Sequence, residues 1–166
     1  MVAGYIAILF GRSRRSDDLY FILEYLDEED FLELCRLARM EGFTLLQGSI
    51  EAEESLRQLY RHYLAEGYGV RFIYEDSLLP NIEAKLARTD IHRYALNNNV
   101  TVIVNGKFRI RISPIELQIA YKLKLGSDKD IGDAVFLYTL LVDAINKDEL
   151  KNWCMVLQVD CSILEG

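Results

Sequence analysis

The stretch VTVIVNGKFRIRI, residues 100–112, carries the strongest local fold signal in the sequence. Two runs of β-branched and aromatic residues flank Asn105-Gly106, the dipeptide that most favours the two-residue turn of a β-hairpin, because both of its residues accept positive φ angles. We therefore expect strands at Val100–Val104 and Phe108–Ile112. This antiparallel pair is the reference point from which the elements before and after it are assigned.

Downstream of the hairpin, the sequence predicts a helical C-terminal third. Ser113-Pro114-Ile115-Glu116 has the form of a capping box with proline at the first helical position, and the helix that it opens is expected to run to Leu125. A second helix is expected to start at Ser127, where Asp130 repeats the capping pattern. A last amphipathic helix is expected over about residues 147–159.

Upstream of the hairpin, apolar runs alternate with amphipathic stretches. The continuous apolar run Ala3–Phe10 and the alternating run Asp17–Leu23 predict strands that are neighbours in one sheet. The other expected elements are strands at Phe43–Leu46, Val70–Tyr74 and Ile82–Leu86, helices at about 28–40 and 50–66, and a turn at Pro80-Asn81. A helix that continues from Ile82 to Leu96 is the alternative to the last strand.

This order of elements predicts an α+β (mixed α/β) fold, with a mixed sheet flanked by helices, a β-hairpin and a helical C-terminal third. The length of 166 residues corresponds to about one domain. We expect residues 1–112 to form its α/β core, including the hairpin, and residues 113–166 to form the helical part of the same domain.

Composition narrows the class of protein. The net charge of −7 argues against broad, nonspecific coating of DNA, and no apolar run reaches the roughly 18 residues that span a membrane. The first ten residues lack the features of a signal peptide, so we expect a cytoplasmic protein. Cys35, Cys154 and Cys161 match no metal-binding spacing and are expected to be free thiols.

The turn Gly11–Ser16 is the main candidate site. Glycine allows a ligand to approach the backbone closely, and serine hydroxyls with the three arginines of the turn can bind phosphate groups. Asp18 follows near the start of the next strand, where a carboxylate can hold Mg²⁺ together with a phosphate. The alternative is that the arginines form a solvated loop and that Asp18 is a strand-end carboxylate in water.

The run Phe10-Gly11-Arg12-Ser13-Arg14-Arg15-Ser16-Asp17-Asp18-Leu19-Tyr20-Phe21 resembles the nucleotidyltransferase superfamily, in which an apolar strand and a Gly-Ser step precede an acidic-apolar-acidic triplet. It looks closest to archaeal relatives of the AbiEii-type group. A second block, residues 115–134, is similar to the helical half of that group, with Lys122 on one helix and Lys129-Asp130 and Asp133 at the start of the next.

The resemblance implies an Mg²⁺ site and a site for a nucleoside triphosphate. Asp18 would be one catalytic and metal-binding carboxylate, and Glu83 is our candidate for a second from a later strand, with Glu75 and Asp76 as alternatives. The residues that would bind the nucleotide are Gly11, Arg12, Ser13, Arg14, Arg15 and Lys122.

One residue departs from the family pattern. Tyr20 stands where the triplet requires its second carboxylate, and Asp17 cannot replace it because neighbouring strand residues point to opposite faces. We therefore expect a degenerate nucleotidyltransferase-like protein that binds a nucleotide or a protein partner, in the defence or toxin–antitoxin setting that the resemblance implies. The alternatives are an active Mg²⁺-dependent enzyme that transfers a nucleotidyl group to protein, RNA or a small acceptor, and an unrelated structural domain.

Overall fold

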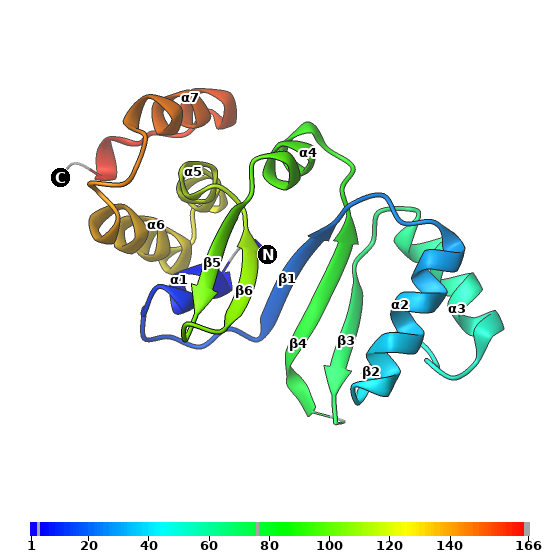
Figure 1. Ribbon diagram of the computed structural model, residues 1–166. Helices are drawn as coiled ribbons and strands as arrows, with labels where there is room; N and C mark the ends of the chain where they lie inside the picture. Colours follow the sequence, from blue (N-terminus) through cyan, green and yellow to red (C-terminus); the bar gives the residue numbers. More distant parts are fainter. Residues whose placement is uncertain (3, 76, 165–166) are drawn as a thin grey trace. The chain divides into compact units, whose positions relative to one another are not determined.

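The computed structural model describes residues 1–2, 4–75 and 77–164, and it confirms the mixed α+β fold (Figure 1). The chain divides into two compact units. The sheet unit is residues 16–96, and the helical unit is residues 1–15 together with 97–166. The hairpin thus groups with the C-terminal helices, whereas the sequence predicts that it belongs to the α/β core of residues 1–112.

The sheet unit is built on four strands, β1 (Asp18–Leu23), β2 (Phe43–Leu45), β3 (Val70–Tyr74) and β4 (Ser77–Leu86). Their order in the sheet is β1-β4-β3-β2, with β1 parallel to β4 and the other neighbours antiparallel. The expected strands at residues 17–23, 43–46, 70–74 and 82–86 are all present. The helix considered as an alternative from Ile82 is not formed, and α4 (Asp90–Asn97) is a separate element.

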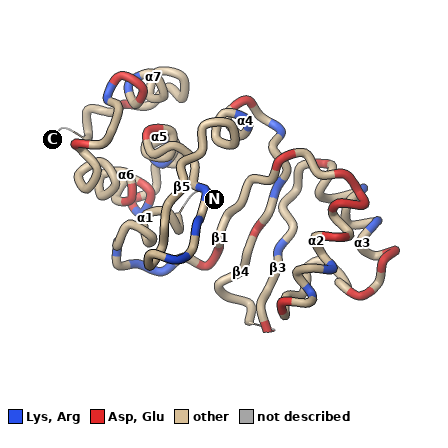
Figure 2. Tube along the Cα trace, viewed as in Figure 1, with Lys and Arg blue, Asp and Glu red and all other residues tan. Residues whose placement is uncertain are grey.

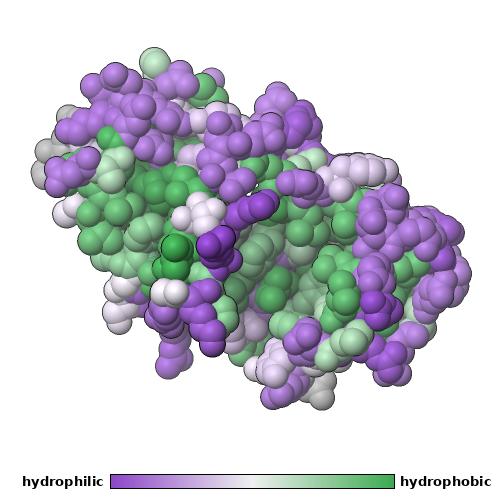
Figure 3. All heavy atoms as spheres, in the orientation of Figure 1, coloured by the Kyte–Doolittle hydropathy of each residue, from purple (hydrophilic) through white to green (hydrophobic). Residues whose placement is uncertain are grey.

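One face of this sheet is covered by α2 (Glu28–Met40), α3 (Glu53–Leu59) and the π-helical turn η1 (Tyr60–Leu64). The side chain of Asp27 accepts a hydrogen bond from Asp30 N at 2.9 Å, as expected for the residue that caps α2. Phe31, Leu64 and Val70 are completely buried in the core between helices and sheet. Figure 3 shows hydrophilic residues over the outer surfaces of α2 and α3, so each helix is amphipathic.

The helical unit contains the hairpin β5 (Val100–Val104) and β6 (Phe108–Ile112), whose turn residues Asn105 and Gly106 have φ angles of 52° and 66°. This confirms the predicted turn. The helices of the unit are α1 (Gly4–Leu9), α5 (Ile115–Leu125), α6 (Asp128–Leu140), α7 (Lys147–Leu157) and the 3₁₀ turn η2 (Ser162–Leu164). α5 packs against both α6 and α7.

The strand predicted at residues 3–10 is wrong. Residues 4–9 form α1, whose Ile6 and Ala7 are completely buried, and Ala3 lies outside the described residues. The error has a physical reason, because a short continuous apolar run does not alternate and is compatible with a buried helix as well as a buried strand. The first element of the strand–turn–strand arrangement is therefore missing.

Two local turn and cap predictions are also corrected. Pro80 and Asn81 are part of β4, and the chain instead reverses after β3, where Glu75 has a φ angle of 46°. Pro114 is the N-cap of α5, and no side chain caps the helix there. The Ser113 hydroxyl instead donates to Gln118 Oε1 at 3.0 Å, and Glu116 Oε1 accepts from Asn146 N at 2.8 Å. The expected capping box is thus absent there.

The cysteines differ from expectation as well. Cys154 of α7 and Cys161 form a disulfide, so the prediction of free thiols is wrong for this pair. Cys35 is a free thiol in the core, where burial raises its pKa to about 12. Such a thiol stays protonated and unreactive at neutral pH.

We predict that reduction of Cys154–Cys161 destabilises the helical unit by about 2 kcal/mol, because the bond restricts the unfolded chain over a sequence separation of 7 residues. Thermal unfolding followed by circular dichroism, with and without a thiol reductant, should show a lower Tm in the reduced protein. The double variant Cys154→Ser/Cys161→Ser is the control, and its Tm should not respond to the reductant. An equal Tm for oxidised and reduced wild type would contradict the prediction.

Candidate functional site

The sheet face opposite α2 and α3 carries a cluster of polar side chains around Glu83. Glu83 of β4 is in register with Tyr20 of β1 and with Arg71 of β3, and residues in register point to the same face of a sheet. Lys85 lies two residues further along β4 and points to that face as well. Tyr20, Arg71, Glu83 and Lys85 are together named the Glu83 cluster.

The carboxylate of Glu83 is neutralised by two cations. Arg71 donates to Glu83 Oε2 from Nη2 at 2.7 Å and from Nε at 3.1 Å, and Lys85 Nζ lies 3.4 Å from Oε1. Burial is the largest single effect on this carboxyl and raises its pKa, but hydrogen bonds from Tyr20 and Arg71 and the charges of Arg71 and Lys85 together leave the pKa below its usual value. Glu83 is therefore ionised and paired.

Tyr20 fits into this cluster as a neutral phenol. Burial raises the pKa of Tyr20, and the hydrogen bond with Lys85 offsets this rise only in part. The Lys85 ammonium lies 5.2 Å from the centroid of the Tyr20 ring, within the range of a cation–π contact. The ring and hydroxyl thus contact the two charged partners on β4.

Asp18 lies on the same sheet face, in register with Asn81 of β4. Asn81 Nδ2 donates to Asp18 Oδ1 at 2.6 Å, while Asn81 Oδ1 is buried and has no hydrogen-bond partner among the described residues. The structure therefore places Asp18 and Glu83 on one face, but it gives each carboxylate a protein partner.

The two alternatives to Glu83 lie elsewhere. Glu75 is exposed in the turn after β3, and Asp76 lies outside the described residues. Across the part of the chain that the structure describes, no three His, Cys, Asp or Glu side chains gather as a metal-binding group. Glu83 thus remains the candidate that shares a sheet face with Asp18.

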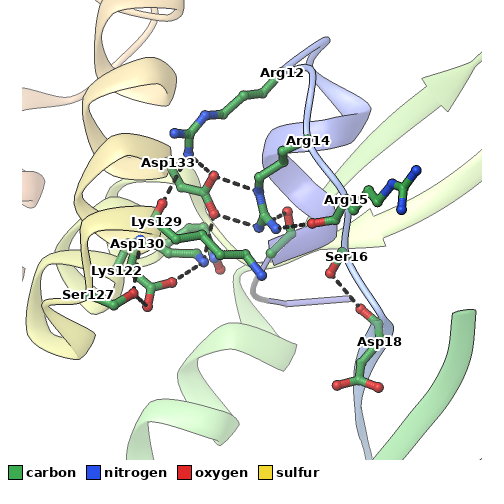
Figure 4. Close-up of polar contacts among 12 residues, drawn as sticks. Arg12, Arg14, Arg15, Ser16, Asp18, Lys122, Ser127, Lys129, Asp130 and Asp133 are labelled. Carbon is green, nitrogen blue, oxygen red and sulfur yellow. Dashed lines mark hydrogen bonds and ion pairs between the residues drawn. The ribbon is translucent and has the colours of Figure 1, made fainter. Parts of the chain in front are cut away.

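A second cluster lies in the helical unit and surrounds the carboxylate of Asp133 (Figure 4). Arg14 donates from Nη2 to Asp133 Oδ2 at 2.7 Å and from Nε to Oδ1 at 2.9 Å, and Arg12 donates to Oδ1. Lys122 Nζ lies 2.8 Å from Asp133 Oδ2 and 2.5 Å from Asp130 Oδ1. These five residues are together named the Asp133 cluster.

The centre of the Asp133 cluster is deeply buried, since Asp133 is 0% and Lys122 only 2% exposed. Burial is the largest effect on Asp133 and raises its pKa, but the hydrogen bonds and charges of Lys122 and Arg14 outweigh it and lower the pKa. Gly132 allows this arrangement, because a Cβ at that position would meet the guanidinium of Arg12. The cluster ties the segment after α1 to α5 and α6.

The Asp133 cluster determines which side chains of the Gly11–Ser16 turn are available to a ligand. Arg12, Arg14 and Lys122 are bound to Asp133, so a phosphate would have to compete with this carboxylate for them. Gly11, Ser13 and Arg15 are exposed, and Figure 4 shows the Arg15 guanidinium directed away from Asp133. Residues 11–15 belong to the helical unit and Asp18 and Glu83 to the sheet unit. A site that joins them stays a prediction.

The partners of these carboxylates were not among the residues that the sequence singled out. Arg71, Asn81 and Lys85 alternate with apolar residues on β3 and β4, and this alternation was the available signal that they share a face. From the sequence, Asp133 stands near the start of a predicted helix. Its position three residues after Asp130 puts both on one face of α6, which is the signal for a shared cation.

The sequence matches no family model, and the curated proteins contain no match to it. Within the described residues, no helix is long and apolar enough to cross a membrane. The case for a function therefore rests on the residues and their contacts.

We predict that Asp133→Asn destabilises the protein by roughly 3–5 kcal/mol, because Arg12 and Arg14 lose their carboxylate partner and Lys122 keeps only the partly buried Asp130. Urea unfolding at neutral pH measures the loss. Asp143→Asn, which removes an exposed carboxylate from the same unit, is the matched control and should change stability by less than about 0.5 kcal/mol. Equal effects of the two substitutions would show that the cluster contributes nothing.

The pH dependence of stability gives a further test of the same carboxylate. The folded-state pKa of Asp133 is lowered. Its contribution to the free energy of unfolding is therefore present above the unfolded pKa of about 3.9 and is lost as the pH falls through the folded value. Wild type should therefore lose its stability advantage over Asp133→Asn as the pH falls below about 4. Urea unfolding of both proteins across this range measures the difference, and a constant difference would contradict the assignment.

Proposed function

We propose that this chain is a degenerate nucleotidyltransferase-like protein that acts by binding and does not transfer nucleotidyl groups. The observation that carries the proposal is the Glu83 cluster, in which Arg71 and Lys85 supply the positive charge that a metal ion would supply in an active site. The resemblance itself now rests on residues 18–21 and 115–134, because residues 4–9 form a helix where the family pattern has a strand.

Mg²⁺ requires oxygen ligands in near-octahedral geometry, and in proteins carboxylates supply most of the charge. At the sheet face, Tyr20 offers a neutral phenol, and Glu83 is already bound through both of its oxygens. A metal ion would have to displace Arg71 and Lys85 and would be repelled by both. These contacts support a loss of catalysis that extends beyond the single substitution at Tyr20.

Of the two binding functions, a protein partner is favoured over a nucleoside triphosphate. A triphosphate bound by Arg12, Arg14 and Lys122 would compete with the buried carboxylate of Asp133, and at Lys122 also with the partly buried Asp130. Only Gly11, Ser13 and Arg15 of the expected nucleotide-binding residues are exposed. A toxin–antitoxin setting, as the resemblance implies, would supply such a protein partner.

We predict that wild-type protein shows no Mg²⁺-dependent rise in Tm, whereas Tyr20→Asp/Lys85→Gln does. The double variant adds a carboxylate beside Asp18 and Glu83 and removes one of the competing cations. Mg²⁺ at ten times its dissociation constant would stabilise that variant by about 1.4 kcal/mol. Tyr20→Phe/Lys85→Gln is the matched control, which lacks the new carboxylate and should not respond.

Activity is measured directly by incorporation of labelled nucleotides into protein and RNA. Wild type should give no incorporation above the level of Asp18→Ala with any nucleoside triphosphate. Robust labelling by wild type that is lost in Asp18→Ala would overturn the proposal and establish the active transferase. The labelling assay thus decides between the two functions without reference to the metal-binding variants.

A further inference from the structure

The β5–β6 hairpin carries a basic surface that the proposed function does not use. Arg109 and Arg111 of β6 are in register with Ile103 and Thr101 of β5, so these four side chains share one face of the two-stranded ribbon. All four residues are exposed, and Ile103 is 60% exposed. Neither arginine side chain has a hydrogen bond or an ion pair within the described residues.

The sequence around the hairpin contains no carboxylate that could compensate this positive charge. The chain has 26 Asp and Glu residues, yet none lies between Asp90 and Glu116 in the sequence. Figure 2 accordingly shows basic but no acidic residues along the hairpin. Many other arginines have carboxylate partners, as where Arg57 contacts Glu28, Glu29 and Glu53. The guanidinium groups of Arg109 and Arg111 are therefore free to contact an anionic ligand.

The turn of the hairpin adds an exposed aromatic ring. Phe108 is 58% exposed, and the Lys107 ammonium lies 5.6 Å from the centroid of its ring. Exposed rings next to cations are the elements with which proteins bind unpaired bases, by stacking on the ring while cations contact the phosphates. Arg109, Arg111 and Lys107 supply the cations, and Phe108 supplies the ring.

We propose that the surface formed by Thr101, Ile103, Lys107, Phe108, Arg109 and Arg111 binds single-stranded nucleic acid. Phe108 points to the ribbon face opposite Arg109, so a ligand that contacts both has to bend around the turn. A flexible single strand bends in this way, whereas a duplex has a persistence length of about 50 nm and pairs its bases away from the ring. This surface is distinct from the Glu83 cluster, and the inference does not depend on the proposed function.

Binding is measured by fluorescence anisotropy with labelled single-stranded RNA and DNA of mixed sequence, and with the matching DNA duplex. Three phosphate contacts predict a slope of about −2 for the logarithm of the association constant against the logarithm of salt concentration. The affinity of wild type should therefore fall roughly 20-fold between 50 and 200 mM salt. Single strands should bind more tightly than the duplex.

The variants separate charge from fold. Arg109→Gln/Arg111→Gln should reduce the slope to about −0.7, and Arg109→Lys/Arg111→Lys should keep it near −2. Phe108→Ala should weaken binding to single strands at least about five-fold. Lys147→Gln/Lys151→Gln removes the same charge from α7 of the same unit and should leave affinity unchanged. Circular dichroism checks that each variant is folded.

Three outcomes would overturn the inference. These are no salt-dependent binding of any single strand by wild type, tighter binding of the duplex, and an equal loss of affinity in the α7 control. None of them bears on the Glu83 cluster, whose tests are the response to Mg²⁺ and the labelling assay.

Discussion

The carboxylate of Asp133 is fully buried and is shared by Arg12, Arg14 and Lys122. A buried ion is tolerated only where it is paired and hydrogen-bonded, so this one carboxylate fixes the path of the segment after α1 against α5 and α6. Gly132 leaves the space that the Arg12 guanidinium occupies, because a Cβ at that position would displace it. Two arginines of the basic turn, which as a sequence suggests a phosphate site, thereby become part of the fold.

The sheet unit repeats this solution around Glu83. Arg71 and Lys85 neutralise a carboxylate on the face where the family resemblance implies a metal ion, and Tyr20 adds a neutral ring that contacts both Glu83 and Lys85. A residual active site that had lost one ligand would leave the remaining carboxylates close together and mutually repelling. Here each has a partner, since Asn81 also donates to Asp18. The charges on this polar face are therefore balanced by its own side chains.

The parts of the structure that the sequence predicts are those set by local interactions. Asn105-Gly106 specifies the hairpin turn, and Ser127 caps α6 through Asp130 N. Residues 4–9 form a helix where a strand is predicted, because a short continuous apolar run has no periodicity that distinguishes the two. The pairing of Arg14 with Asp133 joins residues 119 apart in sequence, and no local pattern selects which basic residue a buried carboxylate will meet. The sequence thus identifies some of the residues in the two clusters, but which partners they pair with depends on tertiary contacts.

Net charge and local charge act on different length scales in this molecule. The net charge of −7 weighs against binding that depends on the field of the whole chain, but at physiological ionic strength charges are screened beyond about 8 Å. Many of the acidic groups of α2 and α3 are paired in place with arginines, as Glu28 is with Arg57 and Arg61. The free guanidinium groups of Arg109 and Arg111 act only on what touches the hairpin. An acidic chain can therefore carry a small basic surface, and the exclusion of broad DNA coating does not extend to it.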